Sequence, residues 1–242
     1  NAVYSHKKGR ITLCAELLAH FESLFRTALT RDHPLCSSKK GCDDLDERVR
    51  SWTLATTTFV LWHEMGHAFV QELKLPAAGR EEDVADQLAV YVANQGNPND
   101  TNSALLRTIK GAAYWFLDSH KRSEAKNTLD FNGHHSLGAV RRTNLACWAY
   151  GRSPKSRKAV GESIPPARRK RCQKEWRQLK LAFDALLKPH RFPAHVRKAR
   201  FDANTTKRRS IADEVEALGK KCRSRAKPYA RLLKKSQAQD KK

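Results

Sequence analysis

The sequence has no long hydrophobic run and no pair of cysteines at CxxC spacing. A membrane-spanning helix needs about 18 or more consecutive apolar residues, and apolar stretches such as Phe59–Trp62 are far shorter. Thiolate zinc sites and thioredoxin-type redox sites depend on CxxC pairs. We therefore predict a soluble globular protein with no transmembrane segment, and the cysteine spacing argues against these two kinds of cysteine chemistry.

The cysteines, six in all, instead favour disulfide bonds and an oxidising compartment. Cys36 and Cys42 flank a short polar loop, and Cys147 and Cys172 lie on two expected helices, so we favour these two pairs. Other pairings remain open, and buried free thiols are the alternative. The chain also begins at Asn1 without an initiator methionine or a leader. Either a signal peptide has been removed or the chain is trimmed, and we expect an exported protein, periplasmic or secreted.

Positive charge is concentrated in the second part of the chain. Residues 1–150 carry 18 Lys and Arg against 17 Asp and Glu, whereas residues 151–242 carry 29 against 8. Such a segment suits contact with a polyanion, a nucleic acid or an anionic membrane surface. No zinc-finger, RNA-recognition or helix-turn-helix signature accompanies it. A polyanion-binding protein is therefore the alternative function, and a solvated charged extension is the other reading of the same residues.

Apolar spacing predicts a mainly α fold. The fold is α+β only because of a small N-terminal β-hairpin, which has a Lys-Lys-Gly turn and an edge strand at Ile11–Cys14. The pattern of residues 45–73 is apolar nearly all round in its second half, so this helix should be central and buried. We expect further helices over 14–30, 81–94, 103–120, 140–150, 165–189 and a short stretch from Ser210 to Cys222, and polar loops over 31–46 and 121–138.

The stretch LWHEMGHAFV, residues 61–70, carries the chemistry. His63 and His67 are spaced to lie on one helix face, where both imidazoles can bind one metal ion, and Glu64 lies beside them. Burying two imidazoles and a carboxylate in an apolar helix is costly unless something compensates, and Zn(2+) would. The alternative is a pair of structural histidines. We predict a zinc site.

A catalytic zinc ion needs a third protein ligand and an open position. The segment REEDVADQLA supplies acids at the start of the next helix, and we predict Glu82 as the ligand. Asp86 then lies one turn further on the same face, where it can accept the outer N–H of a ligating histidine. Glu81 and Asp83 should point elsewhere. Alternatively, all four acids only stabilise the helix N-terminus.

HEMGH followed by Glu82-Asp-Val-Ala-Asp86 resembles the gluzincin pattern of metallopeptidases. Over residues 2–190 the sequence is similar to a bacterial family of metallopeptidases, generally exported. The resemblance implies a zincin-like domain over 1–189, zinc on His63, His67 and Glu82, and Glu64 as base. The basic extension, residues 190–242, lies outside it, and His134 stands where the family usually has an acidic residue. Four segments carry the likeness, in order: VYSHKKGRITLCAELL, FVLWHEMGHAFV with LPAAGREEDVADQLA, HSLGAVRRTNLACWAYG, and a Pro-Ala-Arg-Arg helix with Cys172.

The predicted reaction is hydrolysis of a peptide bond in a peptide or protein substrate. Glu64 takes a proton from the zinc-bound water and returns it to the leaving amine. His135 is the candidate donor to the oxyanion, with Tyr114 and Tyr150 as weaker candidates; a surface histidine or a helix cap is the alternative for His135. The Ile11–Cys14 edge would hold the substrate by backbone pairing. An inactive relative with structural zinc is a third possibility.

Overall fold

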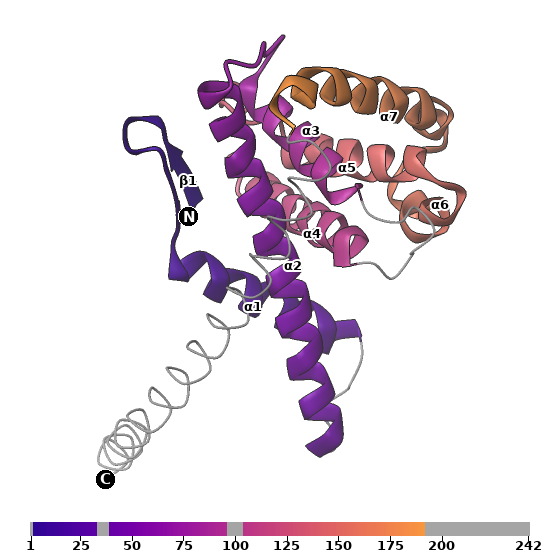
Figure 1. The fold of residues 1–242 in the computed structure, drawn as a ribbon. Helices are drawn as coiled ribbons and strands as arrows, with labels where there is room; N and C mark the ends of the chain where they lie inside the picture. The colour runs from indigo at the N-terminus through magenta and orange to yellow at the C-terminus, as the bar shows by residue number, and fades with distance from the viewer. Residues whose placement is uncertain (1, 33–38, 96–103, 192–242) are drawn as a thin grey trace, which may run out of the picture. The chain divides into compact units, whose positions relative to one another are not determined.

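A long central helix, α2, organises the fold (Figure 1). The structure is a computed structural model that describes residues 2–32, 39–95 and 104–191. It is mainly helical with one small antiparallel sheet, which confirms the predicted fold class. The elements are β1 (Ala2–Ser5), η1 (His6–Lys8), β2 (Arg10–Leu13), α1 (Ala15–Asp32), α2 (Lys39–Glu72), α3 (Glu81–Ala93), α4 (Ala104–Ala125), α5 (Gly138–Arg152), α6 (Pro154–Val160), η2 (Gly161–Ser163), α7 (Pro166–Leu187) and η3 (Lys188–His190).

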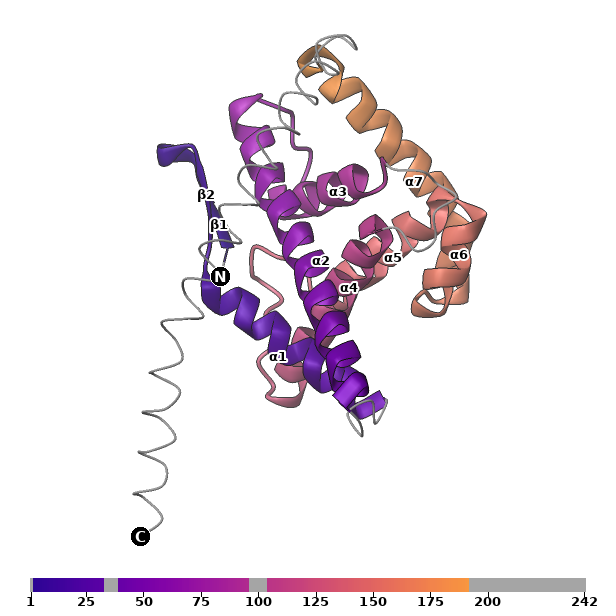
Figure 2. The same cartoon turned by 60° about the horizontal axis from the view of Figure 1, so that its bottom comes forward.

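Helix α2 lies between two groups of elements, as the turned view in Figure 2 also shows. The hairpin and α1 pack on one side, and α3 and α4 pack on the other. Helix α5 then packs on α3 and α4, and α7 covers α5. Apolar residues of α2 such as Val49 and Phe59 are almost fully buried, because both sides of the helix are covered. The prediction of a central, buried helix is confirmed.

A glycine sets the distance between α2 and α3. A Cβ atom on Gly66 would lie 2.7 Å from the Cα of Ala85 and 3.0 Å from its Cβ. Carbon atoms in contact normally lie about 3.5–4.0 Å apart. The two helices therefore approach more closely at this point than any side chain would allow. This brings the first turns of α3 beside the residues on either side of Gly66.

The hairpin pairs β1 with β2 in the register Ala2↔Leu13 to Ser5↔Arg10. Gly9 closes the turn with a φ of 53°, in the left-handed region that glycine adopts without strain. The hairpin packs against α2, with β1 making the larger contact. The predicted hairpin is confirmed, and its first strand is the one that adjoins the central helix.

A disulfide joins α5 to α7. Cys147 and Cys172 are bonded, with their Cα atoms 4.9 Å apart, which confirms this predicted pair. The backbones also meet closely there, since a Cβ on Gly151 would lie 2.1 Å from the carbonyl oxygen of Cys172. Cys14 is a free thiol. The predicted Cys36–Cys42 pair and Cys222 lie outside the residues whose side chains are described.

Two helix boundaries differ from the prediction by several residues, and one helix was not predicted. Helix α2 begins at Lys39, so the loop predicted over 31–46 is wrong from that point on; buried Leu45 and Val49 form one apolar stripe on an otherwise polar first half. Helix α4 continues to Ala125 rather than ending at 120. The sequence analysis missed α6, where Ser153 accepts a hydrogen bond from the Ser156 backbone N–H.

Among the described residues, no helix combines the length and the apolar character that crossing a membrane requires. Asn1–Pro189 forms one unit by its internal contacts. The helix expected from Ser210 to Cys222 lies outside the described residues.

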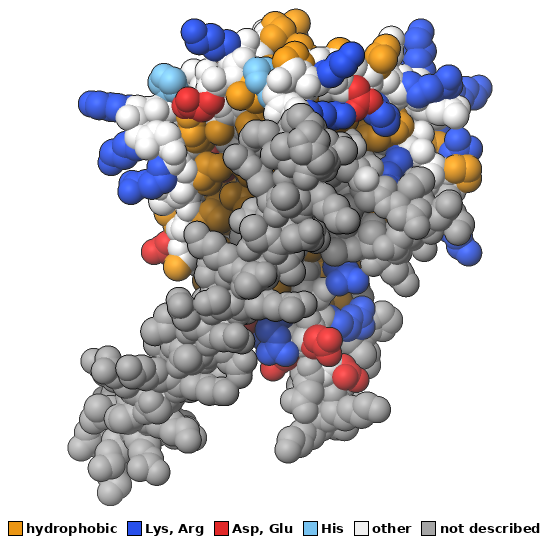
Figure 3. All heavy atoms as spheres, in the orientation of Figure 1, with side chains coloured by type: hydrophobic (Ala, Val, Ile, Leu, Met, Phe, Trp, Pro, Cys, Tyr) orange, Lys and Arg blue, Asp and Glu red, His pale blue; other side chains and the backbone are white. Residues whose placement is uncertain are grey.

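Basic side chains are prominent on the surface of the described residues. Lys and Arg gather at the upper right of the face in Figure 3, where Figure 1 places α7.

Candidate metal centre

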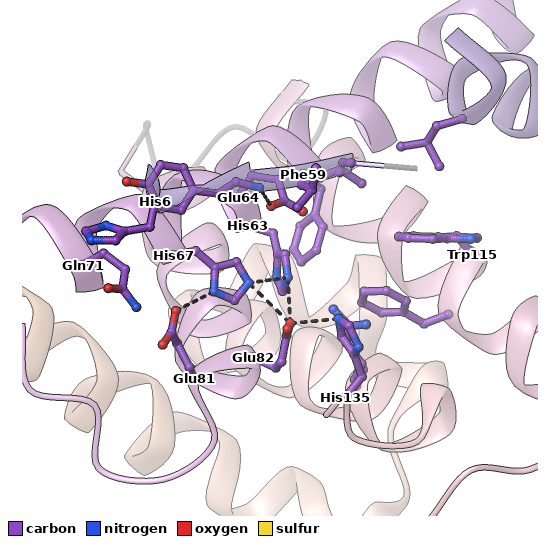
Figure 4. A pocket seen from close by; sticks show the side chains of 17 residues that line it. His6, Phe59, His63, Glu64, His67, Gln71, Glu81, Glu82, Trp115 and His135 are labelled. Carbon is purple, nitrogen blue, oxygen red and sulfur yellow. Dashed lines mark hydrogen bonds and ion pairs between the residues drawn. The ribbon is translucent and has the colours of Figure 1, made fainter. Parts of the chain in front are cut away.

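Two helices supply the side chains of the candidate centre (Figure 4). His63 and His67 lie one turn apart on α2, and Glu82 projects toward them from the first turn of α3. The Nε2 atoms of the two histidines are 3.3 Å apart. The Oε2 atom of Glu82 lies 3.0 Å from Nε2 of His63 and 3.4 Å from Nε2 of His67. Three potential metal ligands thus converge on one point.

These separations fit a metal ion. A four-coordinate tetrahedral ion with bonds of about 2.0–2.1 Å holds its ligand atoms about 3.3–3.4 Å apart. The two distances that involve His67 have this value, and the third is a few tenths of an ångström shorter. The donors are two imidazole nitrogens and one carboxylate oxygen, and a fourth position remains for water or substrate.

The outer nitrogens of both imidazoles are held by carboxylates. Nδ1 of His63 lies 2.9 Å from Oδ1 of Asp86, and Nδ1 of His67 lies 2.8 Å from Oε1 of Glu81. An ionised carboxylate only accepts hydrogen bonds, so both Nδ1 atoms donate to their carboxylates, and both rings are held with Nε2 directed toward the shared point. The prediction that Glu81 points elsewhere is wrong. Its side chain reaches back across the gap between the helices to His67.

Arg141, from α5, fixes Asp86 in turn. Its Nε donates to Oδ2 at 2.7 Å and its Nη2 donates to Oδ1 at 2.8 Å. The guanidinium also lies 3.8 Å from the centre of the Phe116 ring, a cation–π contact. Burial would raise the pKa of Asp86, but Arg141 and His63 hold it below its usual value. Asp86 therefore stays ionised although it is buried.

The surroundings favour positive charge at the point of convergence. Burial lowers the pKa of His63, but the hydrogen bonds to Asp86 and Glu82 outweigh it and raise the pKa to about 9. Burial would likewise raise the pKa of Glu82, whereas His135, His63 and His67 hold it well below its usual range. The ionised carboxylates around the two imidazoles therefore form an environment that stabilises a bound cation.

Glu64, between the two histidines in sequence, is buried at the edge of the same cleft. Its Oε2 accepts a hydrogen bond of 2.6 Å from the backbone N–H of Tyr4 in β1. Ala2, Val3, Tyr4 and His6 all line the cleft, and the Tyr4 hydroxyl donates to Glu72 further along α2. The strand expected to face the substrate, Ile11–Cys14, does not line it. β1 lies between β2 and α2, so β1 takes that position.

His135 lies at the other side of the cleft, in the segment that precedes α5. Its Nε2 is 2.8 Å from Oε2 of Glu82, and half of its side chain is exposed. One ligand atom each from His63, Glu82 and His135 lie within 4.8 Å of one another, so His135 is a second candidate to complete a metal site with those two. His67 fits the site better, because its side chain is more buried than that of His135 and its Nε2 is spaced as a shared ion requires.

The remaining sequence candidates lie elsewhere. Tyr114 packs on Phe25, with ring centres 5.9 Å apart, and Tyr150 lies beneath Arg157. Neither lines the cleft, so neither can reach a reacting group there. Ser136 donates to Asp83 at 2.8 Å, which ties the segment carrying His135 to the first turn of α3.

The cleft itself has a volume of ≈ 560 Å³. Figure 4 shows the candidate metal ligands His63, His67 and Glu82 together in the cleft, with β1 crossing above Glu64. Trp115 and Phe116 of α4 form an apolar wall, and Arg141 is the one Lys or Arg among the residues that line it.

Comparison with known proteins places this site in a family. A family model named DUF4344 and described as "Putative metallopeptidase" matches residues 1–187. No curated protein and no solved structure matches the chain. The matched segment runs from the first strand to the end of α7 and includes every residue of the cleft. By this match the chain belongs to the DUF4344 family of putative metallopeptidases.

Proposed function

We propose that the protein is a zinc-dependent peptidase. The observation that carries the proposal is the convergence of Nε2 of His63, Nε2 of His67 and Oε2 of Glu82 at 3.0–3.4 Å from one another. Two imidazoles and one carboxylate with an open position suit zinc as a catalytic ion. When bound there, zinc would supply a Lewis acid and lower the pKa of its water toward about 7.

Glu64 acts as the general base. Its carboxylate lies in the cleft beside the ligating histidines, where it removes a proton from the attacking water and returns it to the leaving amine. The Tyr4 N–H bond to Oε2 fixes the orientation of this carboxylate and leaves Oε1 to face the water. Asp86, Glu81 and Arg141 act as positioning residues, because they hold the two imidazole rings in the ligating tautomer.

His135 donates a hydrogen bond to the oxyanion that develops on the substrate. Its half-exposed ring stands at the cleft beside Glu82, within reach of a carbonyl held over the metal position. Removing His135 distinguishes this role from that of a metal ligand. Zinc binding should persist if His135 is a hydrogen-bond donor, and should be weakened if it is a ligand.

The substrate is a peptide or protein held in extended form along β1. Peptide substrates follow from the family. Backbone pairing with a strand edge is a common way to hold them, and it would use backbone groups of β1 other than the Tyr4 N–H, which is bonded to Glu64. An exported location agrees with the Cys147–Cys172 disulfide, since such bonds persist in oxidising compartments. Polyanion binding by the basic residues 190–242 stays a prediction, to be tested by the salt dependence of binding with and without that segment.

The decisive experiment measures bound zinc and peptide cleavage together, on the native protein and on Glu64→Gln. We expect about one zinc per chain in both, and a rate of cleavage that falls about 10²–10⁴-fold in the variant. A mixture of synthetic peptides of random sequence serves as substrate. Native protein that binds no zinc, or that binds it and cleaves no peptide, would sink the proposal.

A further inference from the structure

A second cavity, of ≈ 280 Å³, lies on the other side of α4 and α5 from the metal cleft. Neighbouring residues on these helices face the two spaces: Trp115 and Arg141 line the cleft, whereas Tyr114 and Arg142 line the second cavity. No residue lines both. The second cavity is therefore a separate site, to which the proposed peptidase chemistry assigns no role.

Its walls are apolar and aromatic. The rings of Phe25 and Trp52 are stacked with centres 5.8 Å apart, and the ring of Tyr114 lies 5.9 Å from that of Phe25. Aliphatic side chains from α1, α4, α5 and α6 complete the lining, namely Ala28, Leu29, Ile109, Ala113, Leu117, Ala146, Ala159 and Val160. Small-molecule sites commonly combine such walls with a few polar groups, and their volumes begin at about 300 Å³.

The charged groups of the cavity all have one sign. Lys110 and Arg142 line it, and no Asp or Glu does. Arg142 is half-buried and has no ion pair with any residue that the structure describes; burial alone lowers its pKa. A partly desolvated guanidinium without a counter-ion is unfavourable. An anion placed in the cavity would relieve that cost, and the apolar walls would bind the rest of the molecule.

We propose that this cavity binds a small amphipathic carboxylate, with its apolar body between the rings of Phe25, Trp52 and Tyr114 and its carboxylate against Arg142 and Lys110. The volume limits the ligand to a short aliphatic chain or a single aromatic ring. The chain's own basic extension is a poor occupant, because residues 190–242 carry 17 Lys and Arg against 5 Asp and Glu and would meet two further cations.

The test uses three probes of equal chain length: octanoate, octan-1-ol and octylamine. Binding to the full chain is measured by titration calorimetry, with zinc removed by chelation and again with zinc present, so that coordination of the carboxylate to zinc is distinguished. We expect one octanoate per chain in both conditions, bound at least about tenfold more tightly than octan-1-ol, as charge-assisted hydrogen bonds imply. Octylamine should bind more weakly than either.

Variants locate the site. Arg142→Gln should remove most of the preference for octanoate over octan-1-ol, because only Lys110 then faces the carboxylate, and should leave octan-1-ol binding unchanged. Ala113→Trp should fill the cavity and abolish binding of both. Lys121→Gln, at an exposed position of α4 outside the cavity, is the matched control and should change nothing. The proposal is overturned if octylamine binds as tightly as octanoate, if octanoate binds only with zinc, or if Arg142→Gln leaves the preference for octanoate intact.

Discussion

Gly66→Ala is the sharpest test of how the fold builds the metal site. The substitution adds a single Cβ atom, which would lie 2.7 Å from Cα of Ala85 in the facing helix. Carbon atoms in contact need about 3.5–4.0 Å, so α2 and α3 must separate by about 1 Å. Ligand-to-metal distances tolerate only about 0.2 Å. We therefore expect Glu82 to be displaced from the imidazoles, and zinc affinity to fall about 10- to 100-fold.

Stability should change much less than metal affinity. Overpacking costs about 1–3 kcal/mol, and alanine in a helix recovers about 1 kcal/mol relative to glycine. The net loss of unfolding free energy is therefore about 0–2 kcal/mol, and the variant should remain folded.

Zinc affinity is measured by competition with a chromophoric chelator, and unfolding by circular dichroism with and without zinc. Gly161→Ala is the matched control, because the nearest atoms to its new Cβ are those of the Tyr150 ring, at 3.4 Å or more. It should bind zinc as the native protein does. A folded Gly66→Ala protein with native zinc affinity would refute the argument that close helix contact positions Glu82.

Three further predictions concern the same molecule. His135→Ala should retain about one zinc and lose about 10²–10³-fold in kcat, as loss of an oxyanion donor does; loss of the zinc would make His135 a ligand instead. The pKa of His63 is raised to about 9, so its proton must leave when zinc binds at pH 7. Calorimetry in buffers of different ionisation enthalpy should show release of at least about one proton, and zinc affinity should rise about tenfold per pH unit up to about 9; affinity that falls with pH would contradict this. Replacing Cys147 and Cys172 by serine should cost about 3–4 kcal/mol of unfolding free energy, from a sequence separation of 25, with urea denaturation as the assay; an unchanged midpoint would show that the cross-link does not constrain the unfolded chain.

The parts of the site that the sequence predicts are those with local spacing. His63 and His67 share a face of one helix, and Glu82 and Asp86 share a face of the next. The spacing within each pair therefore follows from the helix geometry alone, without knowledge of the fold. The structure brings all four together. The contact of Glu81 with His67 is not predicted, because Glu81 lies on another face of α3 than Glu82 and Asp86. Whether its long side chain can reach His67 depends on how closely the two helices approach.

The contacts that the sequence analysis missed join distant segments. Arg141 and Asp86 are 55 residues apart, and Tyr4 and Glu64 are 60 apart. Nothing local distinguishes Arg141 from Arg142, although one reaches the metal cleft and the other lines the second cavity. The choice depends on how α5 is rotated against α3 and α4. Helix α6 was not predicted for another reason. It is too short to show a helical repeat of apolar residues, and only Ser153 and Pro154 indicate where it begins.

The order of contacts along the chain also has a consequence for how the protein folds. The histidines and their carboxylate partners are separated by only 14 to 23 residues, whereas Tyr4 must close a much longer loop to reach Glu64. Loop-closure entropy rises with loop length. We expect the α2–α3 helical hairpin to capture its ion early in folding and the first strand, although it leaves the ribosome before them, to dock late. If the site holds a metal ion, an unfolding intermediate would then keep the ion after β1 has detached from α2 and no longer covers the cleft.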